Sequence, residues 1–195
     1  MMAAISLAVI LACAPPEVAP ETLQAVIRVE SGGDPLAVGI NLPGQSARAV
    51  HPASRTEALT IVQAVLAQGG SVDLGLMQIN NRNLAGLGYS VADMFDLCAN
   101  IRAGALILQE DYRRALQITP AGQPALRAAL SAYNSGDFAR GFANGYVARY
   151  EGKYAMAPDG DPVRASSLVF HRVEVDSCSA NISVAVTADD DVSQR

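Results

Sequence analysis

Glu30 lies at a position where an ionised carboxylate is energetically unfavourable. Leu23, Val26, Ile27 and Glu30 occupy positions i, i+3, i+4 and i+7, which places them on one helix face. An ionised carboxylate on an apolar face is unfavourable, so we expect its pKa to be raised. Residues 31–35, Ser-Gly-Gly-Asp-Pro, end this helix, so the helix dipole acts in the same direction. Such a group can act as a general acid, for example toward a departing glycosidic oxygen.

Two polar segments have side chains that could complete a site around this acid. Residues 73–80, Asp-Leu-Gly-Leu-Met-Gln-Ile-Asn, contain a glycine where backbone can approach a ligand and an amide within an apolar run. Residues 132–136, Ala-Tyr-Asn-Ser-Gly, end a helix with an aromatic and an amide side chain. Amides pair with sugar hydroxyls and acetamido groups, and aromatic faces cover C–H surfaces. Taken singly, each segment is better explained by capping or turn formation, and Glu30 by a carboxylate that reaches solvent at the helix end.

Four helices are expected to carry these residues. Pro20 suits the first position of the helix that contains Glu30. Ser54 and Glu57 have capping-box spacing and begin an apolar helix that ends at residues 69–70. A third helix is predicted from about Asn100, because apolar residues recur at steps of four, three, four and four: Ile101, Ala105, Leu108, Tyr112 and Leu116. A fourth is predicted from near Pro124, with these residues on one face: Leu126, Ala129, Leu130 and Tyr133.

Strand patterns are scarce in the rest of the sequence. Residues 36–53 contain glycine and proline without periodicity and predict a long loop. Residues 167–188 alternate in places, which we interpret as a tail with at most one strand. The fold class predicted is therefore all-α, or α with a minor β element.

The composition predicts one domain followed by an acidic tail. The chain has 195 residues, of which 50% are hydrophobic and 17% charged, enough for one sizeable core. Its net charge is −5 and its basic residues are scattered, so no clustered footprint for nucleic acid is present. Residues 156–195 carry three basic and seven acidic side chains. We therefore expect a domain over residues 1–155 and a flexible acidic tail over 156–195.

The N-terminal apolar run, residues 1–13, allows two interpretations. It is shorter than the roughly 20 residues that a membrane-spanning helix needs, so we expect no integral membrane span. Its length suits the apolar part of a secretion signal, but no Lys or Arg precedes Arg28. We favour a short apolar helix that closes the core.

The cysteines and histidines give no sign of a metal site. Cys13, Cys98 and Cys178 have no C-x-x-C spacing, and the two histidines, His51 and His171, lie far apart in the sequence. We expect neither a metal nor another cofactor. Cys13 and Cys98 could form a disulfide in an oxidising compartment, and two buried free thiols are the alternative.

In the order Glu-Ser, Gly-Leu-Met-Gln and Ala-Tyr-Asn-x-Gly, the three segments resemble lytic transglycosylases with the soluble-lytic-transglycosylase, goose-lysozyme-like fold. The resemblance extends from about Pro20 to Tyr154 and includes residues 100–104, Asn-Ile-Arg-Ala-Gly, which are similar to the family's Asn-Ile-x-x-Gly helix start. The stretches VESGGDPLAVGIN, SVDLGLMQINNRNL and GFANGYVARY look most like the VirB1 branch, the peptidoglycan-cleaving components of type IV secretion systems.

The resemblance implies a role for individual residues. Glu30 matches the family's single catalytic acid and base. The positions that match its glycan-binding residues are Ser31, Gly75, Met77, Gln78, Tyr133 and Asn134, and a structural role for Ser31 is equally open. The chain departs from the family pattern in a longer segment between Glu30 and Gly75, and in Val-Asp-Leu at residues 72–74, where Gly-Ala-x is usual.

The resemblance also implies a reaction and a location. It implies cleavage of a peptidoglycan glycan strand between N-acetylmuramic acid and N-acetylglucosamine, with a 1,6-anhydro product, in the periplasm or cell envelope and with secretion-system subunits as further partners. One alternative is a lysozyme-like hydrolase that uses Asp73 or another acid to activate water, although Asp34 and Asp73 are more simply turn or cap residues. The other is a non-enzymatic module that binds glycan or secretion subunits.

Overall fold

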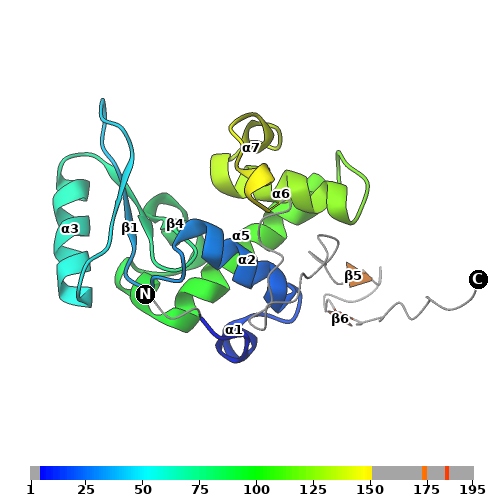
Figure 1. Cartoon of the computed structure of the whole chain (residues 1–195), viewed down its shortest axis with the longest axis horizontal. Helices are drawn as coiled ribbons and strands as arrows, with labels where there is room; N and C mark the ends of the chain where they lie inside the picture. Colours follow the sequence, from blue (N-terminus) through cyan, green and yellow to red (C-terminus); the bar gives the residue numbers. More distant parts are fainter. Residues whose placement is uncertain (1–4, 151–172, 175–182, 185–195) are drawn as a thin grey trace, which may run out of the picture.

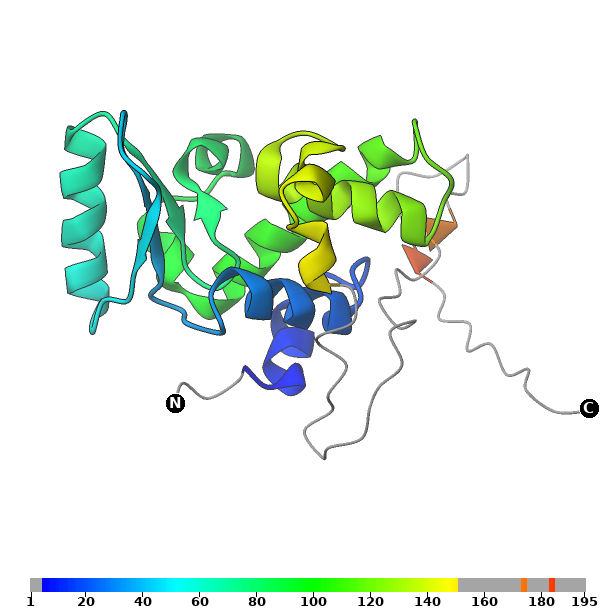
Figure 2. The same cartoon turned by 45° about the horizontal axis from the view of Figure 1, so that its top comes forward.

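The computed structural model describes residues 5–150, 173–174 and 183–184. The helices are α1 (Leu7–Cys13), α2 (Pro20–Glu30), α3 (Arg55–Ala67), α4 (Leu84–Leu87), α5 (Leu97–Ala115), α6 (Gln123–Ser135) and α7 (Arg140–Ala143), and the strands of the main sheet are β1 (Val38–Asn41), β2 (Arg48–Val50), β3 (Ser71–Leu74) and β4 (Ile79–Asn80). Figures 1 and 2 show α3 and the sheet at one end of the molecule and α6 and α7 at the other, with α2 and α5 between them. The prediction of an α fold with a minor β element is confirmed.

Helix α2 forms as its sequence predicts. Pro20 is its first residue, and Leu23, Val26 and Ile27 are buried. The helix ends at Glu30. Its apolar face therefore fixes the position of the glutamate at its end, because burial of that face sets the rotation of the helix about its axis.

Helix α3 begins with the expected cap. Ser54 Oγ accepts the backbone N–H of Glu57 at 3.2 Å. The Glu57 carboxylate accepts the N–H of Ala53 at 2.8 Å, one residue earlier than the standard capping box requires. Helix α3 packs against β1 and β3, as Figure 1 shows.

The prediction of a long loop over residues 36–53 is wrong. Strands β1 and β2 lie within it and belong to an antiparallel sheet of order β2-β1-β3-β4. The sequence hides these strands because they are only four and three residues long. Gly39, which reads as a loop residue, lies inside β1 directly opposite Asp73 of β3.

The sheet has one apolar and one more polar face. Val38 and Ile40 of β1 and Val72 and Leu74 of β3 are buried in the core. Asp73 lies between Val72 and Leu74 and is only partly buried, since successive side chains on a strand point to opposite faces. The alternation thus directs one carboxylate away from the core.

Helix α5 begins three residues earlier than predicted. Asp96 is its N-cap and accepts the N–H of Ala99 at 2.9 Å. Asn100 is therefore an interior, buried residue of the helix and not its start. The apolar periodicity places the start of the helix too late because it does not include the polar Asp96 cap.

Helix α1 confirms that the N-terminal apolar segment contains a short helix packed on the core. Ile10 and Cys13 are buried, and Cys13 forms a disulfide with Cys98 at the start of α5. Arg102 adds a hydrogen bond from its Nε to the carbonyl of Cys13 at 3.2 Å. The disulfide and the hydrogen bond join α1 to α5.

We expect the Cys13→Ala/Cys98→Ala double variant to be less stable than the wild type by about 2–5 kcal/mol, because the bridge closes a long loop in the unfolded chain. The two cysteines are 85 positions apart in the sequence. Thermal unfolding with and without reductant measures the loss, and Cys178→Ala is the control. A double variant as stable as the oxidised wild type would contradict the prediction.

The C-terminal segment is described only in part. Val173–Glu174 (β5) and Ser183–Val184 (β6) pair as antiparallel strands, so this segment contains two short strands where one was expected. The remainder of the predicted tail, residues 156–195, lies outside the described residues. None of the described helices is long and apolar enough to span a membrane.

Candidate active site

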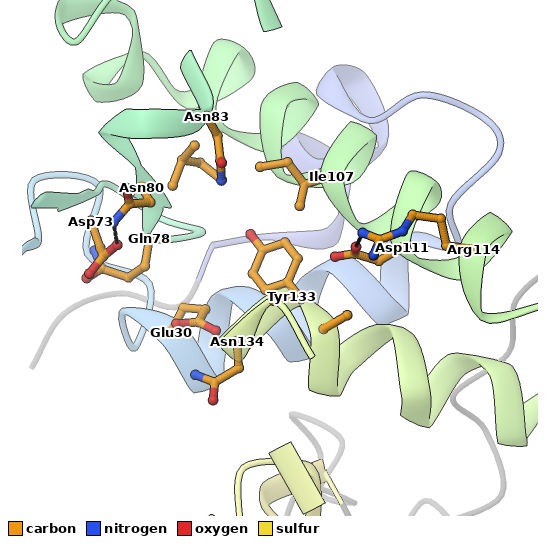
Figure 3. A pocket seen from close by; sticks show the side chains of 13 residues that line it. Glu30, Asp73, Gln78, Asn80, Asn83, Ile107, Asp111, Arg114, Tyr133 and Asn134 are labelled. Atoms are coloured by element: carbon orange, nitrogen blue, oxygen red, sulfur yellow. Dashed lines mark hydrogen bonds and ion pairs between the residues drawn. The ribbon is translucent and has the colours of Figure 1, made fainter. Parts of the chain in front are cut away.

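A pocket of about 470 Å³ lies between the sheet and helices α5 and α6. Its lining residues are Glu30, Asp73, Gln78, Ile79, Asn80, Asn83, Ile107, Asp111, Arg114, Ala132, Tyr133, Asn134 and Gly136. Figure 3 shows Glu30 and Tyr133 in the middle of this pocket, with Asp73, Gln78 and Asn80 on one side and Asp111 and Arg114 on the other. A chain with extended polar substituents fits such a lining, because amides and carboxylates line it from end to end.

Glu30 is held by hydrogen bonds from the segment that follows α7. Tyr146 donates its phenol O–H to Glu30 Oε1. The Tyr150 hydroxyl lies 2.7 Å from that of Tyr146, and it must be the donor there because Tyr146 has one proton. Arg149 donates from Nη2 to the carbonyl of Val29 at 2.9 Å. Three residues of this segment therefore fix the end of α2.

Burial raises the pKa of Glu30 to about 7. The hydrogen bond from Tyr146 and the charge of Arg149 lower the pKa, and the charge of Asp73 raises it, but burial dominates. Glu30 thus keeps its proton up to near-neutral pH, as its position on an apolar helix face predicts. A carboxyl group with this pKa can donate a proton and then accept one.

We expect the Tyr146→Phe variant to raise the pKa of Glu30 above the wild-type value of about 7. The phenylalanine removes a donor that favours the carboxylate, and the pKa of a group rises when its charged form loses a hydrogen bond. NMR titration of the Glu30 side-chain carbonyl carbon measures the shift. Tyr89→Phe, outside the pocket, is the control, and an unchanged or lower pKa in Tyr146→Phe would contradict the assignment.

The turn between β3 and β4 forms one wall of the pocket. Gly75 has a φ of 68°, and a side chain there would collide with the carbonyl of Met94 and the amide of Asn100. Gln78 has a φ of 48°, which is uncommon for a residue other than glycine and marks local strain. Its amide donates to the carbonyls of Gly75 at 2.9 Å and Ala37 at 3.2 Å.

A buried amide holds this turn in place. Asn100 Oδ1 accepts the N–H of Met77 at 2.8 Å, and its Nδ2 donates to the carbonyls of Leu74 at 2.8 Å and Met94 at 2.9 Å. Ser31 joins the turn to the end of α2 by donating to the carbonyl of Leu76 at 2.8 Å. The turn is therefore fixed relative to Glu30 through side chains of α5 and of the α2 end.

Helix α6 supplies the wall opposite the turn. Tyr133 donates its hydroxyl to the carbonyl of Met77 at 2.8 Å. Burial, followed by the negative charge of Glu30, holds the pKa of Tyr133 well above its usual range, so the phenol stays neutral. Asn134 accepts from Asn144 Nδ2 at 3.1 Å, and Asn144 Oδ1 in turn accepts the N–H of Tyr146 at 3.0 Å. Asn134 thus connects α6 to the segment that holds Glu30.

An ion pair closes the far side of the pocket. Arg114 Nη1 lies 3.3 Å from Asp111 Oδ1, and the guanidinium also lies over the ring of Phe138. Burial raises the pKa of Asp111 to about 6, while Arg114 lowers it. This side of the pocket therefore presents a cation next to a carboxyl group.

The structure divides the predicted site residues into two groups. Glu30, Gln78, Tyr133 and Asn134 line the pocket together. Ser31, Gly75 and Met77 do not line it: Ser31 and Gly75 shape the turn, and the Met77 side chain is fully buried. Met77 contributes through its backbone, whose carbonyl receives the Tyr133 hydroxyl.

Sequence reasoning missed several members of the site. Asp73 is a strand residue in the pocket, so its interpretation as a turn or cap residue is wrong. Asp34 does serve as a turn residue: it accepts the N–H of Leu36 at 2.8 Å, and it pairs with His51 outside the pocket. The contact of Tyr146 with Glu30 joins residues 116 positions apart, which no local pattern reveals.

No group of three or more His, Cys, Asp or Glu within the described part of the chain is placed to hold a metal ion. The side chains that line the pocket offer proton transfer and hydrogen bonding.

The transglycosylase SLT domain family matches residues 9–156 of the chain. The chain is 44% identical over 131 residues to "Type IV secretion system protein virB1" of Brucella suis, which covers 67% of this chain and 53% of that protein. It is 43% identical over 139 residues to "Protein virB1" of Agrobacterium tumefaciens, which covers 71% of this chain and 56% of that protein. The chain thus spans about half the length of these curated relatives. No solved structure matches it significantly.

Proposed function

The chain belongs to the transglycosylase SLT domain family, and we propose that it is a peptidoglycan lytic transglycosylase. The substrate is the glycan strand, and the bond cleaved is the β-1,4 bond between N-acetylmuramic acid and N-acetylglucosamine. Cleavage yields a 1,6-anhydro-muramyl end. The observation that carries the proposal is Glu30, a carboxyl group with a raised pKa in a pocket lined by amides and Tyr133.

Glu30 serves this reaction in two steps. Its proton passes to the glycosidic oxygen as the bond from that oxygen to the muramyl C1 breaks, which leaves Glu30 ionised and C1 electron-deficient. The carboxylate then takes the proton of the muramyl C6 hydroxyl, whose oxygen bonds to C1. Glu30 ends protonated as it began, and no water is consumed.

The walls of the pocket support the binding of a glycan. Gln78, Asn80 and Asn83 present amides from the sheet side, and Asn134 presents one from α6. Amides pair with the hydroxyl and acetamido groups that amino sugars carry. The hydrogen bond from the Tyr133 hydroxyl to the carbonyl of Met77 keeps the two walls at a fixed separation.

Mass spectrometry of purified peptidoglycan digested by the full chain tests the proposal. Soluble fragments that end in 1,6-anhydro-muramic acid are the expected product. Fragments that end in reducing muramic acid would instead support a hydrolase, for which the presence of Asp73 in the pocket is the specific observation. Absence of soluble fragments, with the protein still bound to the glycan, would support the non-enzymatic module.

The relatives suggest where this activity is used. The name of the Brucella relative places that protein in a type IV secretion system. We extend this to the present chain: it acts in the bacterial cell envelope, in the periplasm, where local opening of the wall makes room for a secretion apparatus. Subunits of that apparatus are then its protein partners.

The division into a domain of residues 1–155 and a tail of residues 156–195 is part of the proposal. We expect a chain that ends at Tyr154 to cleave peptidoglycan within about threefold of the full chain, because the residues of the pocket and the partners of Glu30 all lie before residue 151. Release of soluble fragments per unit time measures this. Loss of folding or of cleavage on truncation would make the C-terminal segment an integral part of the domain.

A further inference from the structure

Asp73 is placed in the pocket by the register of the sheet. It lies directly opposite Gly39 of β1 and Asn80 of β4, so the three residues form one row across three strands. Asn41 lies two positions after Gly39 and hence on the same face of β1. Asp73 and Asn80 of this row line the sheet side of the pocket, to one side of Glu30, as Figure 3 shows.

Two amides hold the Asp73 side chain from opposite sides. Asn41 donates from Nδ2 to Oδ2 at 2.7 Å, and Asn80 donates from Nδ2 to Oδ1 at 2.7 Å. Amide N–H donors on both oxygens match a carboxylate, which has only acceptors. The two hydrogen bonds leave the carboxylate little freedom to turn, so its position relative to Glu30 is fixed.

The absence of a side chain at Gly39 makes room for this arrangement. A Cβ at position 39 would lie 3.0 Å from the Cβ of Asp73 and 3.0 Å from Oε1 of Gln78. Contacts this short force the neighbouring side chains to move. The sequence therefore has a glycine inside a strand at the point where two pocket residues need the space, despite the usual cost of glycine there.

We propose that Asp73 is the second carboxylate of the reaction: clamped by Asn41 and Asn80, it stabilises the positive charge that develops at the muramyl C1 while Glu30 transfers the proton. The proposal rests on the proposed transglycosylase function and adds a residue to it. A fixed negative charge in a partly buried site costs little reorganisation when the charge at C1 appears. Asp73 takes no proton and forms no bond, so the proton balance of the reaction is unchanged.

The negative charge of Asp73 also affects the pKa of Glu30. Asp73 adds to the effect of burial on Glu30, against Tyr146 and Arg149, which favour the carboxylate. The Tyr150 hydroxyl contacts the Tyr146 hydroxyl that is bound to Glu30. Loss of the Asp73 charge therefore lowers the pKa of Glu30.

The test compares Asp73→Asn with the wild type on purified peptidoglycan, with Asp96→Asn as the charge-matched control. Asn100 and the pocket are untouched in the control, because an asparagine caps α5 as well as an aspartate does. In Asp73→Asn, a flip of the Asn41 amide restores the hydrogen bonds, so the fold is kept. The Asn80 amide stays in place because its Oδ1 accepts the N–H of Arg82. Should Asp73→Asn not fold, Asp73→Ser, which leaves room for a bridging water, takes its place.

We expect kcat to fall about 10²-fold in Asp73→Asn, as for the loss of one preorganised electrostatic group. The alkaline limb of the pH profile of kcat/KM is expected to move to lower pH, and the proportion of anhydro ends to stay unchanged. Glycan binding is compared between Glu30→Gln and the Glu30→Gln/Asp73→Asn double variant. We expect equal affinities, because the charge that Asp73 stabilises is absent from the bound ground state.

Other outcomes overturn the inference. Wild-type kcat in Asp73→Asn, or an unmoved alkaline limb, would leave Asp73 without an electrostatic role. Weaker glycan binding by the double variant would make it a binding residue, and a selective loss of reducing ends would make it a base for water. A wild-type digest without anhydro ends is a separate result, since it rejects the proposed function itself before any variant is compared.

Discussion

Replacement of Glu30 by glutamine is expected to abolish peptidoglycan cleavage and to leave the fold intact. General acid catalysis contributes about 10²–10⁴-fold, and here the same group is also the base for the C6 hydroxyl, so the loss should reach the upper part of that range. Glutamine has nearly the shape of the protonated carboxyl group and still accepts the Tyr146 hydrogen bond. It has no acidic proton to give to the glycosidic oxygen.

The effect of the same substitution on stability depends on pH. In the folded protein the pKa of Glu30 is about 7, against the ordinary glutamate value of 4.5 in the unfolded chain. The folded state therefore holds more protons between these two values, so the stability of the wild type falls as the pH rises through this window. Above it the cost amounts to about 3 kcal/mol. Glu30→Gln removes this cost.

Thermal unfolding at several pH values measures this effect. We expect Glu30→Gln to be more stable than the wild type at pH 8 and equal to it below the ordinary glutamate pKa of 4.5. Glu110→Gln, an exposed residue in a surface ion pair, is the control and should keep full cleavage activity. Cleavage by Glu30→Gln within about threefold of the wild type would refute the mechanism, and a large loss of melting temperature at every pH would make Glu30 a structural residue.

Asn100→Ala is expected to have the second largest effect, on both stability and cleavage. The change leaves the N–H of Met77 and the carbonyls of Leu74 and Met94 without their partner in a buried site. Buried polar groups that lose a hydrogen bond cost about 1–3 kcal/mol each, so we expect a loss of at least about 3 kcal/mol. For a domain of this size, that corresponds to a melting temperature lower by about 10 °C.

Cleavage by Asn100→Ala should fall even at temperatures where the protein is folded. Asn100 fixes the turn that presents Gln78, and Met77 in that turn receives the Tyr133 hydroxyl. Calorimetry and product release measure the two effects, with Gln63→Ala on the exposed side of α3 as the control for loss of an amide. A variant with wild-type melting temperature and activity would show that Asn100 does not organise the turn.

Features that depend only on neighbouring residues can be predicted from the sequence. The position of Glu30 at the end of an apolar helix face follows from the spacing of Leu23, Val26 and Ile27, and the structure confirms it. The raised pKa follows from the same spacing, because burial is its main cause. The Ser54 cap of α3 is likewise a short-range signal, since cap and partner are three residues apart.

The pairing of Cys13 with Cys98 was left open by the sequence. The sequence allows a Cys13–Cys98 disulfide or two buried free thiols, and the structure contains the disulfide. The packing of α1 against α5 brings these two together. The choice depended on which faces of two distant helices meet, and no pattern within either helix contains that information.

The surroundings of Glu30 depend on contacts between distant segments of the chain. Tyr146 reaches it from 116 positions away, and Asp73 enters the pocket because the register of β3 with β1 and β4 turns it away from the core. These strands are too short for their alternation to stand out in the sequence, and they are stable only through their neighbours in the sheet. Helix periodicity is a local property that a chain displays along its length, whereas strand register and contacts between distant segments are fixed only when the whole core packs.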